Sequence, residues 1–261
     1  MVLNSPGVGS RGRPSTSHIP TARADSLAEA LGRLARELDQ HDDLETLLTA
    51  IGRGAVELVP GAEEGSVGLL AARRRVTWHA PIGELPRFVD SVQEEVREGP
   101  SLDAVHSQRT VRVIDLAAED RWLGFATRAS AAGAASILSL PLYARGDNLG
   151  ALNLYARIPN AFTDESEHVG LLYAGHAAIA FAGLRIQVQL NESVRNRDLI
   201  GQAKGILMER YAISGERAFL TLAQISQDSN RKLHDIAEEL VHTGTLADSG
   251  ALPPDQPVTR T

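Results

Sequence analysis

The chain has 261 residues, of which 43% are hydrophobic and 23% are charged, so it can bury the core of at least one sizeable domain. Its formal net charge of −7 excludes a general electrostatic attraction to nucleic acid or to an anionic membrane, so any such contact must come from a local patch. The absence of cysteine excludes disulfides, thiolate metal sites and a cysteine nucleophile, and it agrees with a cytoplasmic location. No apolar run approaches the roughly 20 residues that span a bilayer, so we expect no membrane segment.

Both ends of the chain are rich in Gly, Pro, Ser and Thr and lack an apolar stripe, which predicts disordered tails over residues 1–24 and 245–261. Between the tails we predict two domains, over residues 25–185 and 186–244. Leucines three and four positions apart predict helices over about 25–38 and 44–58.

The next part of the chain alternates between strand and helix patterns. A helical pattern covers residues 84–98 and is stopped by Gly99-Pro100. Short β-branched and apolar runs predict five strands, over about 66–70, 75–79, 110–114, 136–142 and 149–155. Residues 145–148, Arg-Gly-Asp-Asn, have the composition of a turn between the last two strands. This order predicts an α+β fold, with an antiparallel sheet flanked by helices.

A long connecting helix is predicted from Thr163-Asp164 to beyond residue 210, because a cap with acids in the first turn is followed by a stretch without helix breakers. Its apolar positions are Leu171, Leu172, Gly175, Ala178, Ile179, Ala182, Leu184 and Val188. We expect this helix to form a homodimer by coiled-coil-like packing. The alternative is that it packs on the sheet of its own chain, and both can hold along different parts.

Three helical patterns end the ordered part of the chain. The first runs to Tyr211, the second starts at Ser214, and the third follows Ser229-Asn230 and ends before Gly244. They predict an all-α three-helix bundle of about 45 residues, near the lower size limit for independent folding.

The bundle carries motifs of a known family. Residues 200–210 (IGQAKGILMER), 218–219 (AF), 226–233 (SQDSNRKL) and 236–240 (IAEEL) resemble, in order and spacing, an ANTAR domain. The resemblance implies a dimeric transcription antitermination regulator, which binds paired stem-loops in a nascent mRNA and so prevents a terminator hairpin.

The preceding domain resembles a GAF sensor domain of the kind that actinobacteria fuse to ANTAR. The resemblance rests on residues 98–104, 120–122, 139–142, 149–155 and 161–163. Relatives commonly have Cys where this chain has Ser101, so thiol-based sensing is not expected here. The chain also lacks the Asn-Lys-x-x-Phe-Asp-Glu signature of cyclic-nucleotide binding.

The ANTAR resemblance places the RNA-binding residues in two motifs. These residues are Gln202, Ala203, Lys204, Gly205, Met208, Ser226, Asn230, Arg231 and Lys232. Small residues allow close approach to splayed loop bases, and Lys and Arg reach phosphates. The alternatives are helix packing for Gly205, an ordinary solvated side chain for Lys204 and a helix N-cap for Asn230. Residues 195–242 contain seven Lys or Arg and seven Asp or Glu, so non-specific attraction to phosphates is weak. We therefore expect binding to depend on specific loop contacts and on two bundles per dimer.

Aromatic side chains of the sensor domain are candidates to line the pocket of an unidentified small-molecule ligand, with core packing as the alternative. They are Trp78, Trp122, Phe125, Tyr143 and Tyr155. The eight histidines show no paired metal-ligand spacing, so we predict no metal site and no cofactor. The sequence has no nucleophile elbow, P-loop or dinucleotide-binding motif, and we predict that it is not an enzyme.

Two other functions remain as alternatives. The three helices can act as a DNA-binding helix-turn-helix, although Asp235, Glu238 and Glu239 on the third helix oppose phosphate contact. The chain can also be a ligand-sensing scaffold whose tail only dimerises.

Overall fold

The computed structural model describes residues 29, 32, 36, 43–71 and 75–246. The chain divides into two compact units, Met1–Ala182 and Gly183–Thr261, and each is described by itself. The predicted tails lie almost wholly outside the described residues, and so does most of the helix predicted over 25–38, of which Glu29, Gly32 and Arg36 are described as helical.

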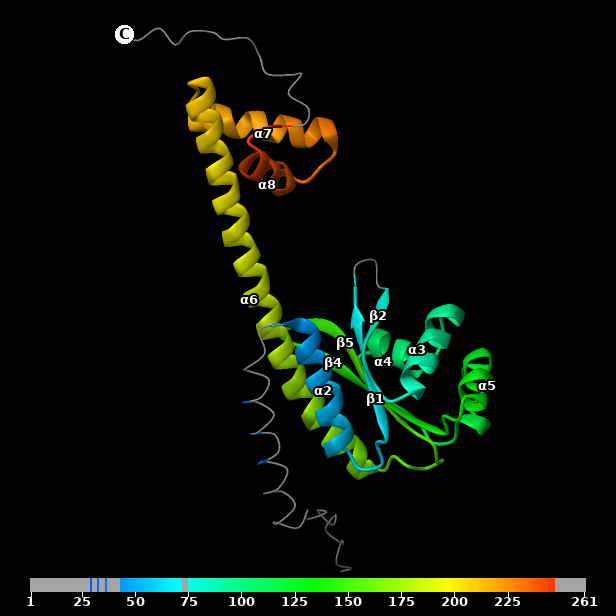
Figure 1. Cartoon of the computed structure of the whole chain (residues 1–261). Helices are drawn as coiled ribbons and strands as arrows, with labels where there is room; N and C mark the ends of the chain where they lie inside the picture. The colour runs from blue at the N-terminus through cyan, green and yellow to red at the C-terminus, as the bar shows by residue number, and fades with distance from the viewer. Residues whose placement is uncertain (1–28, 30–31, 33–35, 37–42, 72–74, 247–261) are drawn as a thin grey trace, which may run out of the picture. The chain divides into compact units, whose positions relative to one another are not determined.

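The first unit contains the predicted sheet of five antiparallel strands (Figure 1). The strands are β1 (Glu64–Leu70), β2 (Val76–Ile82), β3 (Val111–Val113), β4 (Ser136–Ala144) and β5 (Asp147–Ala156). Their order is β2-β1-β5-β4-β3, and every neighbouring pair is antiparallel. The α+β prediction is confirmed.

The β4–β5 hairpin is tighter than the sequence suggested. Ala144 pairs with Asp147, so the loop is reduced to Arg145 and Gly146, both with positive φ (54° and 91°). This backbone suits a two-residue hairpin because its twist matches that of the strands. Gly150 of β5 is also required by the sheet, since an added Cβ there would lie 1.9 Å from the carbonyl oxygen of Gly68 on β1.

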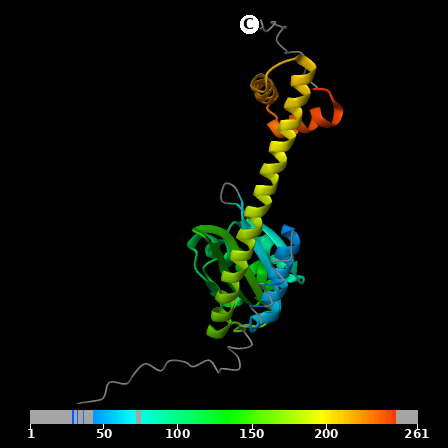
Figure 2. The same cartoon turned by 90° about the vertical axis from the view of Figure 1, so that its left-hand side faces the viewer.

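Helices cover both faces of this sheet, and Figure 2 shows α6 running across one of them. On that face lie α2 (Leu44–Leu58) and the first part of α6 (Asp164–Tyr211), and Tyr173 of α6 donates a hydrogen bond to the carbonyl of Ile51 in α2 at 2.8 Å. The other face is covered by α3 (Leu85–Val96) and α4 (Pro100–Ser107), with α5 (Leu123–Ala131) packed against α3. A short 3-10 helix spans Leu116–Ala118.

Two of these helices were not predicted. Gly99-Pro100 was interpreted only as the end of the preceding helix, whereas Pro100 is the first residue of α4, a position where its missing N–H costs nothing. The segment of α5 is rich in Ala and contains Gly124, so it shows no stripe of large apolar residues.

α6 corrects the expectation that no segment has the length and hydropathy of a membrane span. Its 48 residues include an 18-residue window with a mean hydropathy of 1.5. By length and composition only, this helix is long and apolar enough to cross a membrane. Part of that window, 39%, is buried within the protein, and Tyr173, Ala177 and Phe181 are among the buried residues. One side of the window therefore belongs to the core of the first unit.

The second unit is the predicted three-helix bundle, formed by the end of α6, α7 (Gly215–Ser229) and α8 (Leu233–Thr243). Its core consists of side chains that are at most 1% exposed, namely Ala203, Leu207, Ala218, Leu222, Ile236, Ala237 and Leu240. Phe219, the neighbour of the buried Ala218, is 42% exposed and points away from that core.

The N-cap of α7 gives a first prediction. The Ser214 hydroxyl accepts a hydrogen bond from the backbone N–H of Arg217 at 3.2 Å. Ser214→Ala removes this acceptor and is expected to lower the free energy of unfolding of the bundle by about 1 kcal/mol. Chemical denaturation followed by circular dichroism measures this loss. Ser214→Asp, which keeps an acceptor, should retain most of the stability, and equal loss in both variants would contradict the capping role.

Candidate RNA-binding and sensor sites

The first group of predicted RNA-binding residues lies on the last part of α6. Gln202, Gly205 and Met208 are exposed, and Lys204 is half-buried. A methyl group added at Gly215, the first residue of α7, would lie 3.4 Å from Met208 Sδ and 3.8 Å from Lys204 Nζ. The side chains of Lys204 and Met208 therefore reach the N-terminal end of α7.

Ala203 is a correction to the predicted set. It is fully buried in the core of the bundle, together with Leu207 and Ala218. The resemblance placed it at the RNA surface because it lies between Gln202 and Lys204, but the helical period turns it inward. Ala203 thus supports the positions of its neighbours and cannot contact RNA in this arrangement.

The second group forms the turn between α7 and α8. Asn230 adopts a left-handed conformation (φ 51°) and ends α7, with its N–H donating to the carbonyl of Gln227. The Ser226 hydroxyl donates to the carbonyl of Arg231 at 2.6 Å, and the Arg231 N–H donates to the carbonyl of Ser226. Ser226 and Asn230 therefore shape this turn. The third helix follows Asn230, as predicted, but Asn230 does not cap it, since the N-cap of α8 is Lys232.

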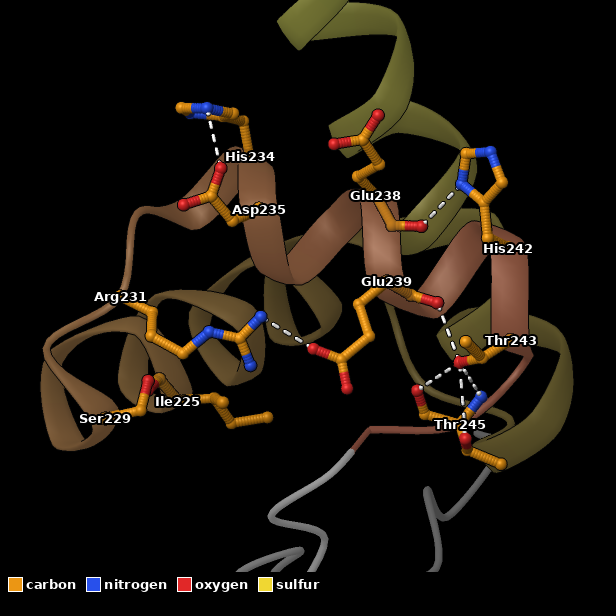
Figure 3. Close-up of polar contacts among 10 residues, drawn as sticks. All are labelled: Ile225, Ser229, Arg231, His234, Asp235, Glu238, Glu239, His242, Thr243 and Thr245. Atoms are coloured by element: carbon orange, nitrogen blue, oxygen red, sulfur yellow. Dashed lines mark hydrogen bonds and ion pairs between the residues drawn. The ribbon is translucent and has the colours of Figure 1, made fainter.

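The two cations of the second group, Arg231 and Lys232, differ in their partners, and Figure 3 shows the partner of Arg231. Arg231 forms an ion pair with Glu239 of α8 at 2.7 Å, and His234 contacts Asp235 at 2.9 Å. Lys232 has no ion-pair partner among the residues that the structure describes. Because the Arg231–Glu239 pair is partly exposed, it is worth at most about 1 kcal/mol, so its guanidinium can be exchanged to a phosphate at low cost.

The two groups lie at opposite ends of α7. Lys204 and Met208 reach Gly215 at its start, whereas Ser226 and Asn230 lie at its end. A helix of 15 residues is about 22 Å long. The structure therefore does not gather the predicted residues into one site, but places them in two separate regions of one bundle.

The predicted aromatic lining of the sensor domain is also divided. Trp122, Phe125 and Tyr155 are at most 5% exposed and pack in one core cluster with Val89 of α3. Trp78 packs against a second cluster, and Tyr143 is 46% exposed. These five side chains do not line one cavity.

A buried polar layer that the sequence did not reveal lies between these two clusters. Its side chains are at most 3% exposed and come from α3, α4, β1, β4 and β5: Ser66, Asp90, Gln93, Ser101, Ser139, Asn153 and Tyr155. The Tyr155 hydroxyl donates to Asp90 Oδ1 at 2.5 Å and lies 3.5 Å from the Ser66 hydroxyl. The Ser101 hydroxyl contacts Gln93 Nε2 at 3.0 Å and the Ser139 hydroxyl at 3.3 Å.

Burial raises the pKa of Asp90 to about 7, and hydrogen bonds from Tyr155, Ser66 and Gln93 oppose this rise only in part. Between about pH 4 and pH 7 the unfolded chain loses the Asp90 proton while the folded protein keeps it. The free energy of unfolding should therefore fall by about 1 kcal/mol per pH unit across this range and level off above it. Denaturant titrations at several pH values measure how steeply the free energy of unfolding changes with pH in the wild type and in Asp90→Asn. The difference between the two proteins should vanish if Asp90 titrates like an exposed carboxyl.

Comparison with known proteins agrees with the two units. A family model described as a GAF domain matches residues 41–182, and a model described as an ANTAR domain matches residues 188–241. No curated protein matches the chain.

Several solved structures are similar to the chain at low identity. The GAF domain of a phosphoenolpyruvate-protein phosphotransferase from Coxiella burnetii is 18% identical, with 64% of this chain and 98% of that chain covered and a TM-score of 0.49. The corresponding domain from Acinetobacter is 16% identical, with coverages of 62% and 96% and a TM-score of 0.48. Free methionine-R-sulfoxide reductase from Neisseria meningitidis is 16% identical, with coverages of 66% and 96% and a TM-score of 0.47.

The GAF model alone spans more than half of the chain, and the ANTAR model follows it in the order that the motifs predicted. Both are regulatory domains. The chain therefore belongs to the GAF domain family and joins its GAF domain to an ANTAR domain, the architecture of sensor-regulated, RNA-binding antitermination proteins.

Proposed function

We propose that this protein is a cytoplasmic, homodimeric antitermination regulator, in which residues 25–185 form the sensor and residues 186–244 bind paired stem-loops in nascent mRNA. The ANTAR match over residues 188–241, together with an exposed polar surface at the end of α6, is the observation that carries the proposal. The sensor is proposed to take a small ligand or another signal and to control how the two bundles are presented.

The α6 group has the chemistry that a stem-loop requires. Gly205 is exposed, and an added Cβ there would meet nothing within 4 Å, so RNA can approach the helix backbone closely. A glycine inside a helix costs about 1 kcal/mol relative to alanine, and helix packing does not explain it here. Lys204 has no ion-pair partner within the described part of the chain, which leaves its ammonium available for a phosphate.

The α7–α8 turn supplies the second contact region of each bundle. Lys232 offers a positive charge without an ion-pair partner in the described ranges, and Arg231 can leave Glu239 for a phosphate. Because this region lies about 22 Å along α7 from the first, one bundle can contact two separated parts of a stem-loop.

An exposed apolar stripe on α6 supports the homodimer. It consists of Leu172, Gly175, Ile179, Gly183, Ile186, Leu190 and Val194, and its five large side chains are 38–61% exposed. The positions repeat at 11 residues, as in Leu172, Gly183 and Val194, a spacing that keeps one face of a nearly straight helix toward a partner helix. Gly175 and Gly183 have open space above them, so a second helix can approach closely there.

A second copy of the chain fits this stripe better than a lipid bilayer does. The opposite side of the same segment is buried in the first unit through Ala174, Ala178 and Phe181. A helix with one side in the core of its own domain leaves only a strip of apolar surface, which is the geometry of helix pairing.

Lys204→Ala tests the α6 group. A charge-assisted hydrogen bond contributes about 1.5–3 kcal/mol, so the substitution is expected to weaken binding of an RNA with two short hairpins at least tenfold. Fluorescence anisotropy with labelled RNA measures the affinity. Arg53→Ala removes one exposed cation from α2 of the sensor domain and is the matched control. Equal affinities of the two variants would argue against a phosphate contact of Lys204.

A further inference from the structure

The two faces of the sheet differ in a way that packing alone does not require. The face toward α2 and α6 is apolar, with Val67, Leu138, Leu140, Leu152 and Leu154 fully buried. The face toward α3 and α4 instead places polar side chains in the middle of the sheet, where Ser66 pairs with Asn153 and Asn153 pairs with Ser139. Burying so many polar groups costs free energy unless each one is paired, so the stability of this face depends on the hydrogen bonds within the layer.

Asp90 of α3 is the only carboxyl group in the polar layer, and its surroundings are neutral. It contacts Tyr155 of β5 at 2.5 Å and Gln93 of its own helix at 3.5 Å, and both donate to Oδ1. No Lys, Arg or His pairs with it among the residues that the structure describes. Other ionisable groups on the surrounding elements are exposed or paired elsewhere, as are Glu94 and Glu95 of α3, Asp103 and His106 of α4, and Glu64 and Arg157, which pair with each other.

A buried carboxyl group without a cationic partner is more stable protonated than ionised. Ionisation in a low-dielectric interior is unfavourable until water or new donors reach the group. The donors nearby are already engaged, because the Gln93 amide both donates to the Ser101 hydroxyl at 3.0 Å and accepts from the Ser101 N–H at 3.0 Å. Through Gln93, a rearrangement at Asp90 reaches Ser101 at the start of α4.

One acceptor of the layer also lacks a partner. Asn153 is fully buried, and its Oδ1 accepts no hydrogen bond, while its Nδ2 lies 3.4 Å from the Ser66 hydroxyl. The Ser66 hydroxyl in turn contacts Tyr155, the donor to Asp90. The hydrogen-bond network around Asp90 therefore leaves one buried acceptor unsatisfied.

We propose that Asp90 is a proton-binding input of the sensor domain, and that loss of its proton rearranges the hydrogen bonds that join α3 and α4 to the sheet. The signal read at this site is then proton concentration. This inference deepens the proposed function, because it names one signal that the sensor reads, but the rearrangement itself occurs whether or not the chain binds RNA.

The test is a pH titration of the full chain without RNA. Carbon NMR of protein labelled at the aspartate carboxyl carbon should show one signal, absent in Asp90→Asn, with a midpoint near pH 7. The only two tryptophans, Trp78 and Trp122, lie in the sensor domain, so their fluorescence should change with the same midpoint. The control Asp103→Asn, at an exposed position of α4, should leave both transitions unchanged.

Tyr155→Phe provides a second test that keeps the carboxyl group. The Tyr155 hydrogen bond lowers the pKa of Asp90, so its removal should move both midpoints to higher pH. A midpoint below pH 5, a midpoint unmoved by Tyr155→Phe, or a fluorescence transition that persists in Asp90→Asn would overturn the inference. RNA titrations at a fixed pH are independent of these outcomes, so a failure here is distinct from a failure of the proposed RNA binding.

Discussion

Ile179→Glu combined with Leu190→Glu is expected to convert the protein to a monomer and to lower its affinity for a two-hairpin RNA by roughly 100-fold. The first effect follows because two helices that pair along the α6 stripe would bury carboxylates against each other without cations. The second follows because linking two binding modules raises the affinity of the pair by roughly 10²–10⁴ over that of one module. Sedimentation equilibrium and RNA anisotropy measure the two effects.

A matched control lies on the same helix. Val188→Glu with Asn191→Glu also adds two acids to exposed positions of α6, but the helical period places Val188 opposite the stripe. This control should remain dimeric and keep its RNA affinity. If both double variants stay dimeric, the stripe is not the dimer interface. If the stripe variant becomes monomeric and still binds the two-hairpin RNA tightly, the two-bundle mode of binding is wrong.

Leu207→Ala is the second substitution with a large expected effect. Leu207 is fully buried between the three helices of the bundle. Leu→Ala in a core costs about 2–5 kcal/mol, from lost burial and from the cavity that remains. A bundle of about 45 residues has little more stability than that, so it should be largely unfolded at 37 °C and should not bind RNA.

The two units allow this effect to be located. Both tryptophans lie in the sensor domain, so their fluorescence should report an intact first unit in Leu207→Ala, while circular dichroism shows loss of helix. The control Leu220→Ala changes the same residue type at a position that is 60% exposed on α7, and it should alter stability by less than about 0.5 kcal/mol. Loss of the tryptophan signal in Leu207→Ala would show that the sensor depends on the bundle.

Elements with a strong period could be predicted from the sequence. α2 spans the predicted residues 44–58, and the five strands and the continuous helix from Asp164 to Tyr211 follow from apolar spacing and breaker residues. Such patterns are local, and the residues that form them are adjacent in the chain. α5 lacked this pattern because two of its three buried residues are small, Ala126 and Ala129, and only Phe125 is large. The helix also contains a glycine.

The candidate sites were less predictable because they depend on which side of an element a residue faces. Ala203 and Lys204 are neighbours in one motif, yet one is in the core and the other reaches the start of α7. Asn230 lies between the second and third predicted helices, and the sequence did not show that it ends α7, because its left-handed conformation is set by the turn as a whole.

The polar layer could not be predicted from the sequence because it depends on contacts between residues that are distant in the chain. Asp90 lies on an amphipathic helix among exposed acids, and only the fold brings it to Tyr155, 65 residues away. One signal was present, since Ser66, Ser139 and Asn153 interrupt otherwise apolar strands at inward positions. Their pairing across β1, β5 and β4 could not be inferred before the strand order was known.

The most direct test of the proposed function is an anisotropy titration of the wild-type protein against four nucleic acids: an RNA with two short hairpins, one hairpin alone, a version with scrambled loops, and duplex DNA. We predict tight binding of the two-hairpin RNA at one dimer per RNA, weak binding of the single hairpin and the scrambled loops, and little affinity for DNA. Tighter binding of DNA, or equal affinity for one and two hairpins, would contradict a dimer that reads paired stem-loops.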